Sequence, residues 1–178
     1  MTKIFSVLEP HRRHAGRVAR SASAALFLAV SFLAVAERPA AAVEGSFAGL
    51  AGSWSGAGTV SLSNGGRERI RCRATYAVGS SGNSLEQSLR CASDSYHFEL
   101  RSNVNANGGA ISGSWSEATR NVNGNISGRV RGNQIDALVE ANGFSASITI
   151  VTNGGRQSVS IRSPGKEFSG AAISLSRS

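Results

Sequence analysis

The sequence of 178 residues has few of the side chains that enzymes and metal proteins use most: three histidines, two cysteines and 6% aromatic residues. His11 and His14 lie near the N-terminus, which leaves His97 as the single histidine after residue 42. One histidine and two cysteines are too few for the usual zinc ligand sets. No serine has a histidine to activate it, and no pair of acids stands out for proton transfer. We therefore expect a protein that is not an enzyme and carries no cofactor.

Long apolar runs are also scarce, and the one that is present lies between Ala24 and Ala36. It follows a basic start and ends in the small residues Ala40 to Ala42, which is typical of a secretory signal peptide cleaved after Ala42. A retained anchor is the alternative, but the run is short for a bilayer. The sequence thus predicts a signal peptide at 1–42, a single domain at 43–178, and a periplasmic or secreted location.

Charge is sparse, at 17% of residues, and its excess is positive, with a net charge of +8. Residues 1–42 contain six Lys and Arg against two Glu, so they contribute four of these charges and leave +4 for residues 43–178. The basic residues of that domain are twelve arginines and Lys166. Arginine favours fixed contacts with carboxylate or phosphate. Aromatic and basic residues are not interleaved in a nucleic-acid-binding motif, so we expect no nucleic acid partner.

Small polar and apolar residues alternate with a period of two along the rest of the chain, and Gly, Asn and Ser turns separate the alternating runs. This pattern is typical of antiparallel β-structure. The runs lie near 53–63, 67–76, 85–91, 96–100, 111–115, 128–130, 135–139, 144–150, 159–161 and 173–175. Successive short hairpins favour an up-and-down meander, which protects its edges best by closing. The predicted fold is all-β, an antiparallel up-and-down β-barrel of about ten strands.

The two cysteines, Cys72 and Cys91, lie on the apolar faces of consecutive predicted strands. A hairpin turn centred near Ser81 places them opposite each other to within one residue. An exported protein meets an oxidising compartment, so we expect a structural disulfide. A redox-active pair is the alternative, although such sites usually have the Cys-x-x-Cys spacing.

The opening Gly52-Ser53-Trp54-Ser55-Gly56-Ala57-Gly58 resembles the first strand of calycin barrels, which carries a Gly-x-Trp signature after a short helical turn. The fuller spacing looks most like the nitrobindin and fatty-acid-binding branch, related to the lipocalins. The resemblance implies that Trp54 plugs one barrel end, where Gly52, Gly56 and Gly58 let the strand bend. Nitrobindins hold haem through a histidine near the C-terminus. Residues 98–178 contain no histidine, so the haem ligand is not matched.

Two groups of residues are candidates for binding. The first would line a ligand cavity inside the barrel and consists of Tyr76, Gln87, Phe98, Trp115 and Phe144. Gln87 belongs there because Glu68, Gln87 and Glu117 are the polar residues assigned to the apolar face. The second group is an outer anion patch of Arg71, Arg73 and Arg90, since the hairpin register places Arg73 opposite Arg90. A solvated face near Glu68 and Glu86 is the alternative for this patch.

These observations favour an exported β-barrel that binds a small apolar or amphipathic ligand or an anionic envelope component. Alternation alone does not say which face meets water, so a small outer-membrane β-barrel is an alternative. Outer-membrane barrels carry aromatic girdles and a terminal aromatic residue. This sequence has neither, and we therefore do not expect membrane association. A third interpretation is an inhibitor or interaction module that acts through its surface. The oligomeric state stays open.

Overall fold

A computed structural model describes residues 45–165 and 167–178. The predicted signal peptide and its cleavage site after Ala42 lie outside the described residues. The elements are η1 (Ala48–Leu50), β1 (Gly52–Leu62), β2 (Arg67–Val78), β3 (Ser84–Ala92), β4 (His97–Asn107), β5 (Ala110–Glu117), β6 (Val122–Arg131), β7 (Gln134–Ala141), β8 (Phe144–Asn153), β9 (Arg156–Arg162) and β10 (Phe168–Arg177).

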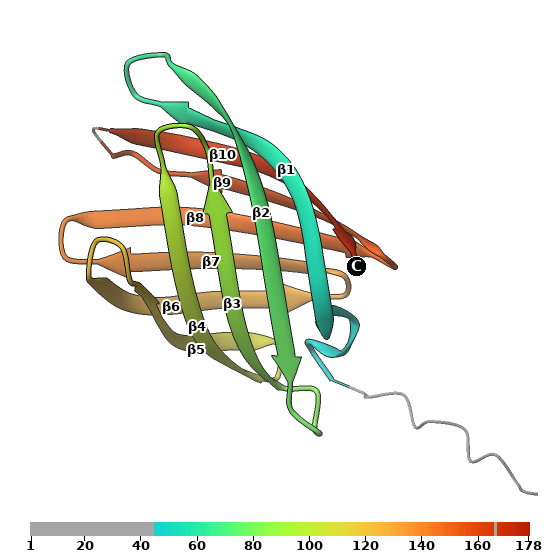
Figure 1. The fold of residues 1–178 in the computed structure, drawn as a ribbon. Helices are drawn as coiled ribbons and strands as arrows, with labels where there is room; N and C mark the ends of the chain where they lie inside the picture. The colour runs from blue at the N-terminus through green and yellow to red at the C-terminus, as the bar shows by residue number, and fades with distance from the viewer. Residues whose placement is uncertain (1–44, 166) are drawn as a thin grey trace, which may run out of the picture. The chain divides into compact units, whose positions relative to one another are not determined.

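The ten strands form one closed antiparallel barrel in which each strand pairs with its neighbours in sequence and β1 pairs with β10 (Figure 1). The predicted up-and-down barrel is confirmed. Closure follows from the chain of short hairpins, since each antiparallel strand returns beside the previous one and the last pairing removes both free edges. No helix within the described residues has the length and apolarity needed to cross a membrane.

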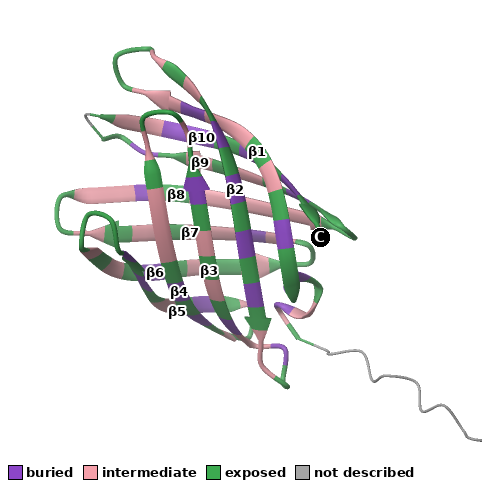
Figure 2. Cartoon of the chain, in the orientation of Figure 1, coloured by how far each residue is buried: buried purple, intermediate pink, exposed green. Residues whose placement is uncertain are grey.

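The apolar face of every strand points into the barrel. On β2, for example, Ile70 and Tyr76 are buried, whereas Arg71 and Arg73 between them are exposed. Buried and exposed segments alternate along β2 in Figure 2. Among the described residues, Leu138 is the large apolar residue left exposed. The outer-membrane alternative requires the opposite arrangement, with apolar side chains outward and polar ones inward.

The two ends of the barrel differ in burial. At the end where β1 begins, which we call the closed end, Phe47, Trp54 and Tyr76 are at most 4% exposed. At the other end, which we call the open end, inward-facing apolar side chains pack on the core yet stay half-buried. They include Leu62, Leu100, Phe98, Val122, Phe144 and Phe168. Because these side chains point inward, solvent reaches them through the mouth of the barrel.

The hairpin of β2 and β3 has the expected register. Cys72 lies opposite Cys91, and Arg73 lies opposite Arg90. The two cysteines form a disulfide, as predicted. The next strand, β4, is longer than the alternation near 96–100 indicated and continues to Asn107. This extension adds Ser102 and Val104 to the buried interior.

Candidate functional site

A line of inward-facing residues runs across the sheet from the closed end towards the open end. Tyr76 lies opposite Gln87, Gln87 opposite Ser102, and Ser102 opposite Trp115. The same line continues through Gly124 and Ala141 to Phe144. We call this line the interior row. Directly opposed side chains on one face are close neighbours, so four of the five predicted cavity residues lie along one path.

Tyr76 forms the closed-end part of the interior row. Its hydroxyl donates a hydrogen bond to Gln157 Oε1 at 2.9 Å, and Gln157 Nε2 donates to Thr152 Oγ1 at 3.2 Å. Tyr76 is 4% exposed, and burial raises the pKa of its phenol to about 12, partly offset by the bond to Gln157. The phenol is therefore neutral at physiological pH and serves as a fixed donor across the barrel.

The middle of the interior row is polar. Ser102 Oγ donates a hydrogen bond to Gln87 Oε1 at 2.9 Å. Ser102 is buried, whereas Gln87 is half-buried. Gln87 is thus partly accessible to solvent, and its amide oxygen is fixed by the hydrogen bond from Ser102.

Trp115 and Phe144 form the open-end part of the interior row. Their ring centroids are 5.9 Å apart and their planes are 64° apart, an edge-to-face arrangement. Trp115 is 8% exposed, and its Nε1 atom has no hydrogen-bond partner among the described residues. Buried donors are usually paired, so this indole needs an explanation.

Phe98, the fifth predicted cavity residue, lies apart from the interior row, opposite Cys91 at the rim of the open end. The guanidinium carbon of Arg120 lies 4.7 Å from the centre of its ring, at cation–π distance. The Arg120 guanidinium, from the turn between β5 and β6, therefore covers one face of Phe98 at the rim.

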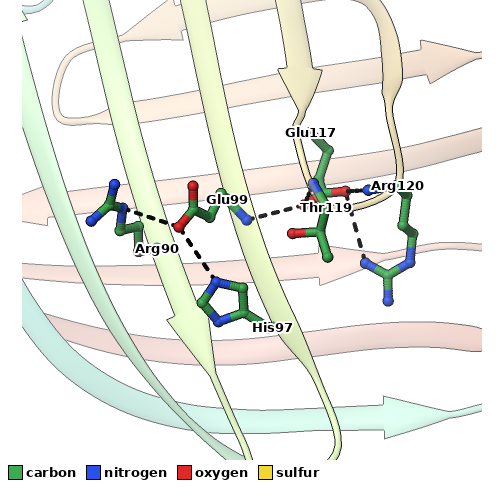
Figure 3. A network of polar contacts seen from close by, with 6 residues as sticks. All are labelled: Arg90, His97, Glu99, Glu117, Thr119 and Arg120. Atoms are coloured by element: carbon green, nitrogen blue, oxygen red, sulfur yellow. Dashed lines mark hydrogen bonds and ion pairs between the residues drawn. The ribbon is translucent and has the colours of Figure 1, made fainter.

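Glu117 holds that turn in place (Figure 3). It is 6% exposed, and its carboxylate accepts backbone N–H bonds from Glu99 at 3.0 Å, Thr119 at 3.1 Å and Arg120 at 2.7 Å. Burial acts to raise the pKa of Glu117, but these hydrogen bonds outweigh it and lower the pKa below its usual value. An ionised carboxylate therefore sits under the rim, with Arg120 Nη1 at 3.9 Å.

The predicted anion patch lies on the outer face, away from the interior row. Arg71, Arg73 and Arg90 are all exposed. Arg90 Nε lies 3.5 Å from Glu99 Oε1, which also contacts His97 Nε2 at 3.4 Å (Figure 3). His97 is exposed and points to the face that carries Glu99.

Trp54 lies at the closed end with 1% of its surface exposed, and its Nε1 donates to the Leu50 carbonyl at 2.8 Å. The guanidinium carbon of Arg177 lies 4.5 Å from the centre of its ring. Arg177 also donates to the carbonyl oxygens of Gly49, at 2.7 Å, and Ala51. A side chain on Gly56 would collide with the backbone of β10, so glycine permits this closure.

The sequence reasoning missed several polar residues on the inward faces of their strands, among them Ser102, Gln157 and Arg177. Naming only Glu68, Gln87 and Glu117 as polar members of the apolar face was wrong. Alternation alone could have identified two of them. Gln157 lies two residues before Val159, and Arg177 lies two residues after Leu175, so each falls on the inward face of its strand.

Outside the barrel, a groove of about 660 Å³ crosses the outer face of β4 to β7. Polar side chains line it, among them Arg101, Asn103, Asn125 and Glu140. Within residues 45–165 and 167–178 there is no group of three or more His, Cys, Asp or Glu side chains placed to hold a metal ion.

Comparisons with known proteins identify the fold. No protein-family model matches the chain. No curated protein matches it either. Rv2717c from M. tuberculosis is similar in structure, with a TM-score of 0.59 and 13% identity over 73% of this chain and 93% of its own. The S-type phycobiliprotein lyase CPES from Guillardia theta has a TM-score of 0.51 and 11% identity over 74% of this chain and 90% of its own. Together with the closed barrel, these likenesses give a calycin-like fold.

The second likeness corrects one expectation. The scarcity of catalytic residues led us to expect a protein that is not an enzyme, and that expectation is wrong as a conclusion about this type of barrel. A protein described as a lyase has the same fold. Fold does not determine function, so activity has to be judged at the site.

Proposed function

We propose that the barrel binds a small apolar or amphipathic molecule, which enters through the open end and lies along the interior row. The observation that carries the proposal is the contrast in burial between the two ends. The closed end is sealed around Trp54, whereas inward-facing side chains such as Phe98 and Phe144 stay half-buried. Ligand sites are mostly apolar with a few placed polar groups, and the interior row has that composition.

The resemblance of residues 52–58 to the fatty-acid-binding and nitrobindin branch supports a ligand inside the barrel, as in its members. A periplasmic or secreted location belongs to the same proposal. The disulfide between Cys72 and Cys91 supports it, because such bonds persist in oxidising compartments.

A matched pair of variants tests the interior site. Phe144→Asp places a charge among the inward side chains of the open end, while Leu138→Asp places the same charge on the outer face, where Leu138 is 39% exposed. Titration with diphenylhexatriene, an apolar fluorophore, should show binding that Phe144→Asp weakens at least about tenfold, since a buried charge is costly. Leu138→Asp should bind as the unchanged protein does. If Leu138→Asp weakened binding and Phe144→Asp did not, the site would lie on the outer surface.

The outer arginines give a second candidate function, contact with an anionic envelope component. Arg73 faces Arg90 across the β2–β3 hairpin, and like charges directly opposed are unfavourable unless an anion or solvent separates them. Arg90 is near Glu99, which leaves Arg71 and Arg73 for such a contact. Sedimentation with anionic vesicles at low salt, repeated with Arg71→Ser/Arg73→Ser, distinguishes this role: no loss of binding in the variant would refute it.

A further inference from the structure

The groove on the outer face of β4 to β7, which we call the outer groove, is separate from the barrel interior. Its volume of about 660 Å³ lies within the range of about 300–1,000 Å³ that is typical of small-molecule sites. The strands that form it are paired with one another along their length, so its shape is fixed by the sheet. A hollow of this size in a rigid surface is a candidate for binding.

Side-chain length along the strand register explains the shape of the outer groove. On the outer face of β5, Ser114 and Ser116 are short and form the floor. The side chains directly opposite these serines on the flanking strands are larger and form the walls. They are Arg101 and Asn103 of β4, and Asn123 and Asn125 of β6.

The asparagines of the outer groove have no partner in the protein. Within residues 45–165 and 167–178, the side chains of Asn103, Asn123 and Asn125 form no hydrogen bond with another residue, whereas Asn133 donates to Asn153 in the turns beyond the groove. Asparagine favours turns and is depleted in strands, so its presence inside β4 and β6 does not serve the sheet. Their position around one hollow gives these amides a role in binding.

The lining favours a neutral molecule with many hydroxyl groups. Each amide offers donors and an acceptor, and each serine hydroxyl does the same, which matches the hydroxyl groups of a sugar. The charged side chains of the lining are Arg101 on β4 and Glu140 on β7. Neither forms an ion pair within the described residues, and their charges sum to zero. A polyanion would therefore gain no net attraction from the lining.

The length of the outer groove favours an oligosaccharide over a single sugar. From β4 to β7 the groove crosses three inter-strand spacings, about 14 Å, which is longer than one sugar ring. An extended peptide is less favoured, because peptides commonly bind by adding a strand to a free sheet edge and the closed barrel has none. We infer that the outer groove binds a neutral oligosaccharide through the amide and hydroxyl groups of β4, β5 and β6. The inference goes beyond the proposed interior site and does not depend on it.

Titration of the ¹⁵N-labelled protein with four oligosaccharides tests the inference. Cellotetraose, maltotetraose and tetraacetylchitotetraose are neutral, and tetragalacturonate is the anionic comparison. At least one neutral sugar should shift the side-chain amide signals of the groove asparagines at millimolar concentration, and tetragalacturonate should bind more weakly. Added salt should leave the affinity for the neutral sugar unchanged, because screening acts on charges.

Two asparagines on the same face of β4 provide a matched pair of variants. Asn103 lines the outer groove, whereas Asn105, two residues further on, is also exposed but lies outside the lining. Asn103→Ala should weaken binding of the tightest neutral sugar about three- to tenfold, the usual effect of one hydrogen bond, and Asn105→Ala should leave it unchanged. Ser114→Tyr fills the floor with a residue that strands favour and should abolish binding. Ser158→Tyr, at an exposed position of β9, should not.

No amide shift with any of the three neutral sugars would overturn the inference, as would sugar binding that Ser114→Tyr leaves intact. Tighter binding of tetragalacturonate, lost at high salt, would overturn the neutral ligand. Diphenylhexatriene separates this inference from the proposed function. Ser114→Tyr should bind the dye as the unchanged protein does, because Ser114 lies on the opposite face of the sheet from the interior. Sugar binding without dye binding would refute the proposed function alone.

Discussion

Replacement of Trp54 by alanine is the sharpest test of how the barrel is closed. Its indole is 1% exposed, donates to Leu50 and contacts Tyr76 edge to face with ring centroids 6.4 Å apart. Arg177 covers the ring and donates hydrogen bonds to one backbone carbonyl within η1 and one directly after it. Trp54→Ala would therefore remove the contact surface shared by β1, β2, β10 and the N-terminal turn.

The expected loss follows from these contacts. Truncation of a buried tryptophan to alanine costs about 3–5 kcal/mol, and the indole donor and the cation–π contact place Trp54 at the upper part of that range. Domains of this size unfold with free energies of about 5–15 kcal/mol, so the variant should keep only part of its stability. At roughly 3–4 °C per kcal/mol, the melting temperature should fall by about 10–20 °C.

Urea denaturation and thermal melting followed by circular dichroism measure this loss, with Trp115→Ala as the matched control. Trp115 is also buried, but it forms no hydrogen bond within the described residues and packs against a half-buried Phe144. Its truncation should lower the melting temperature by clearly less. A Trp54→Ala protein that melts normally while Trp115→Ala collapses would show that the closure has been assigned to the wrong tryptophan.

Two other measurements test single interactions. The pKa of Tyr76 is raised to about 12 in the folded protein, against a value near 10 in the unfolded chain, so ionisation of the phenol favours unfolding. The resulting stability, up to about 3 kcal/mol, is fully present below pH 10 and is lost as the pH rises to 12. Tyr76→Phe should remove this dependence of the unfolding free energy on pH in urea titrations between pH 10 and 12, and an unchanged dependence would contradict the assignment. Reduction of Cys72–Cys91, which closes a 19-residue separation, should cost roughly 3 kcal/mol, seen as a lower urea midpoint with reductant; two thiols labelled in denatured, unreduced protein would contradict the bond.

The strands were predictable because alternation is a local property. Each run between turns carries its own apolar face, and one turn position near Ser81 sufficed to align Cys72 with Cys91. The predicted number of strands also agrees with the structure, since short hairpins leave little freedom in the order of pairing. The reach of β4 was underestimated because its second half alternates Ser102, Val104 and Ala106 with polar residues and contains few strongly apolar side chains.

The partners of the interior polar groups were not predictable in the same way. Tyr76 and Gln157 are 81 residues apart in sequence, and Arg177 binds the backbone at Gly49 across 128 residues. Both contacts exist only because closure brings β9 and β10 round to the first strands. Alternation could have placed Gln157 and Arg177 on the inner face, but their partners depend on the stagger of the closed barrel.

The two tryptophans mark the two ends of the barrel, which differ in how tightly they are packed. At the closed end every polar atom of the Trp54 side chain is paired, and the surrounding side chains exclude water, so this end supplies stability without offering an interaction to a ligand. At the open end, the buried indole N–H of Trp115 has no partner among the described residues, and the neighbouring apolar side chains are half-buried. A buried donor without a partner costs free energy, so Trp115 contributes less to stability than Trp54 does. A molecule that binds the folded barrel at its open end should raise the melting temperature, whereas the sealed end keeps the empty barrel folded.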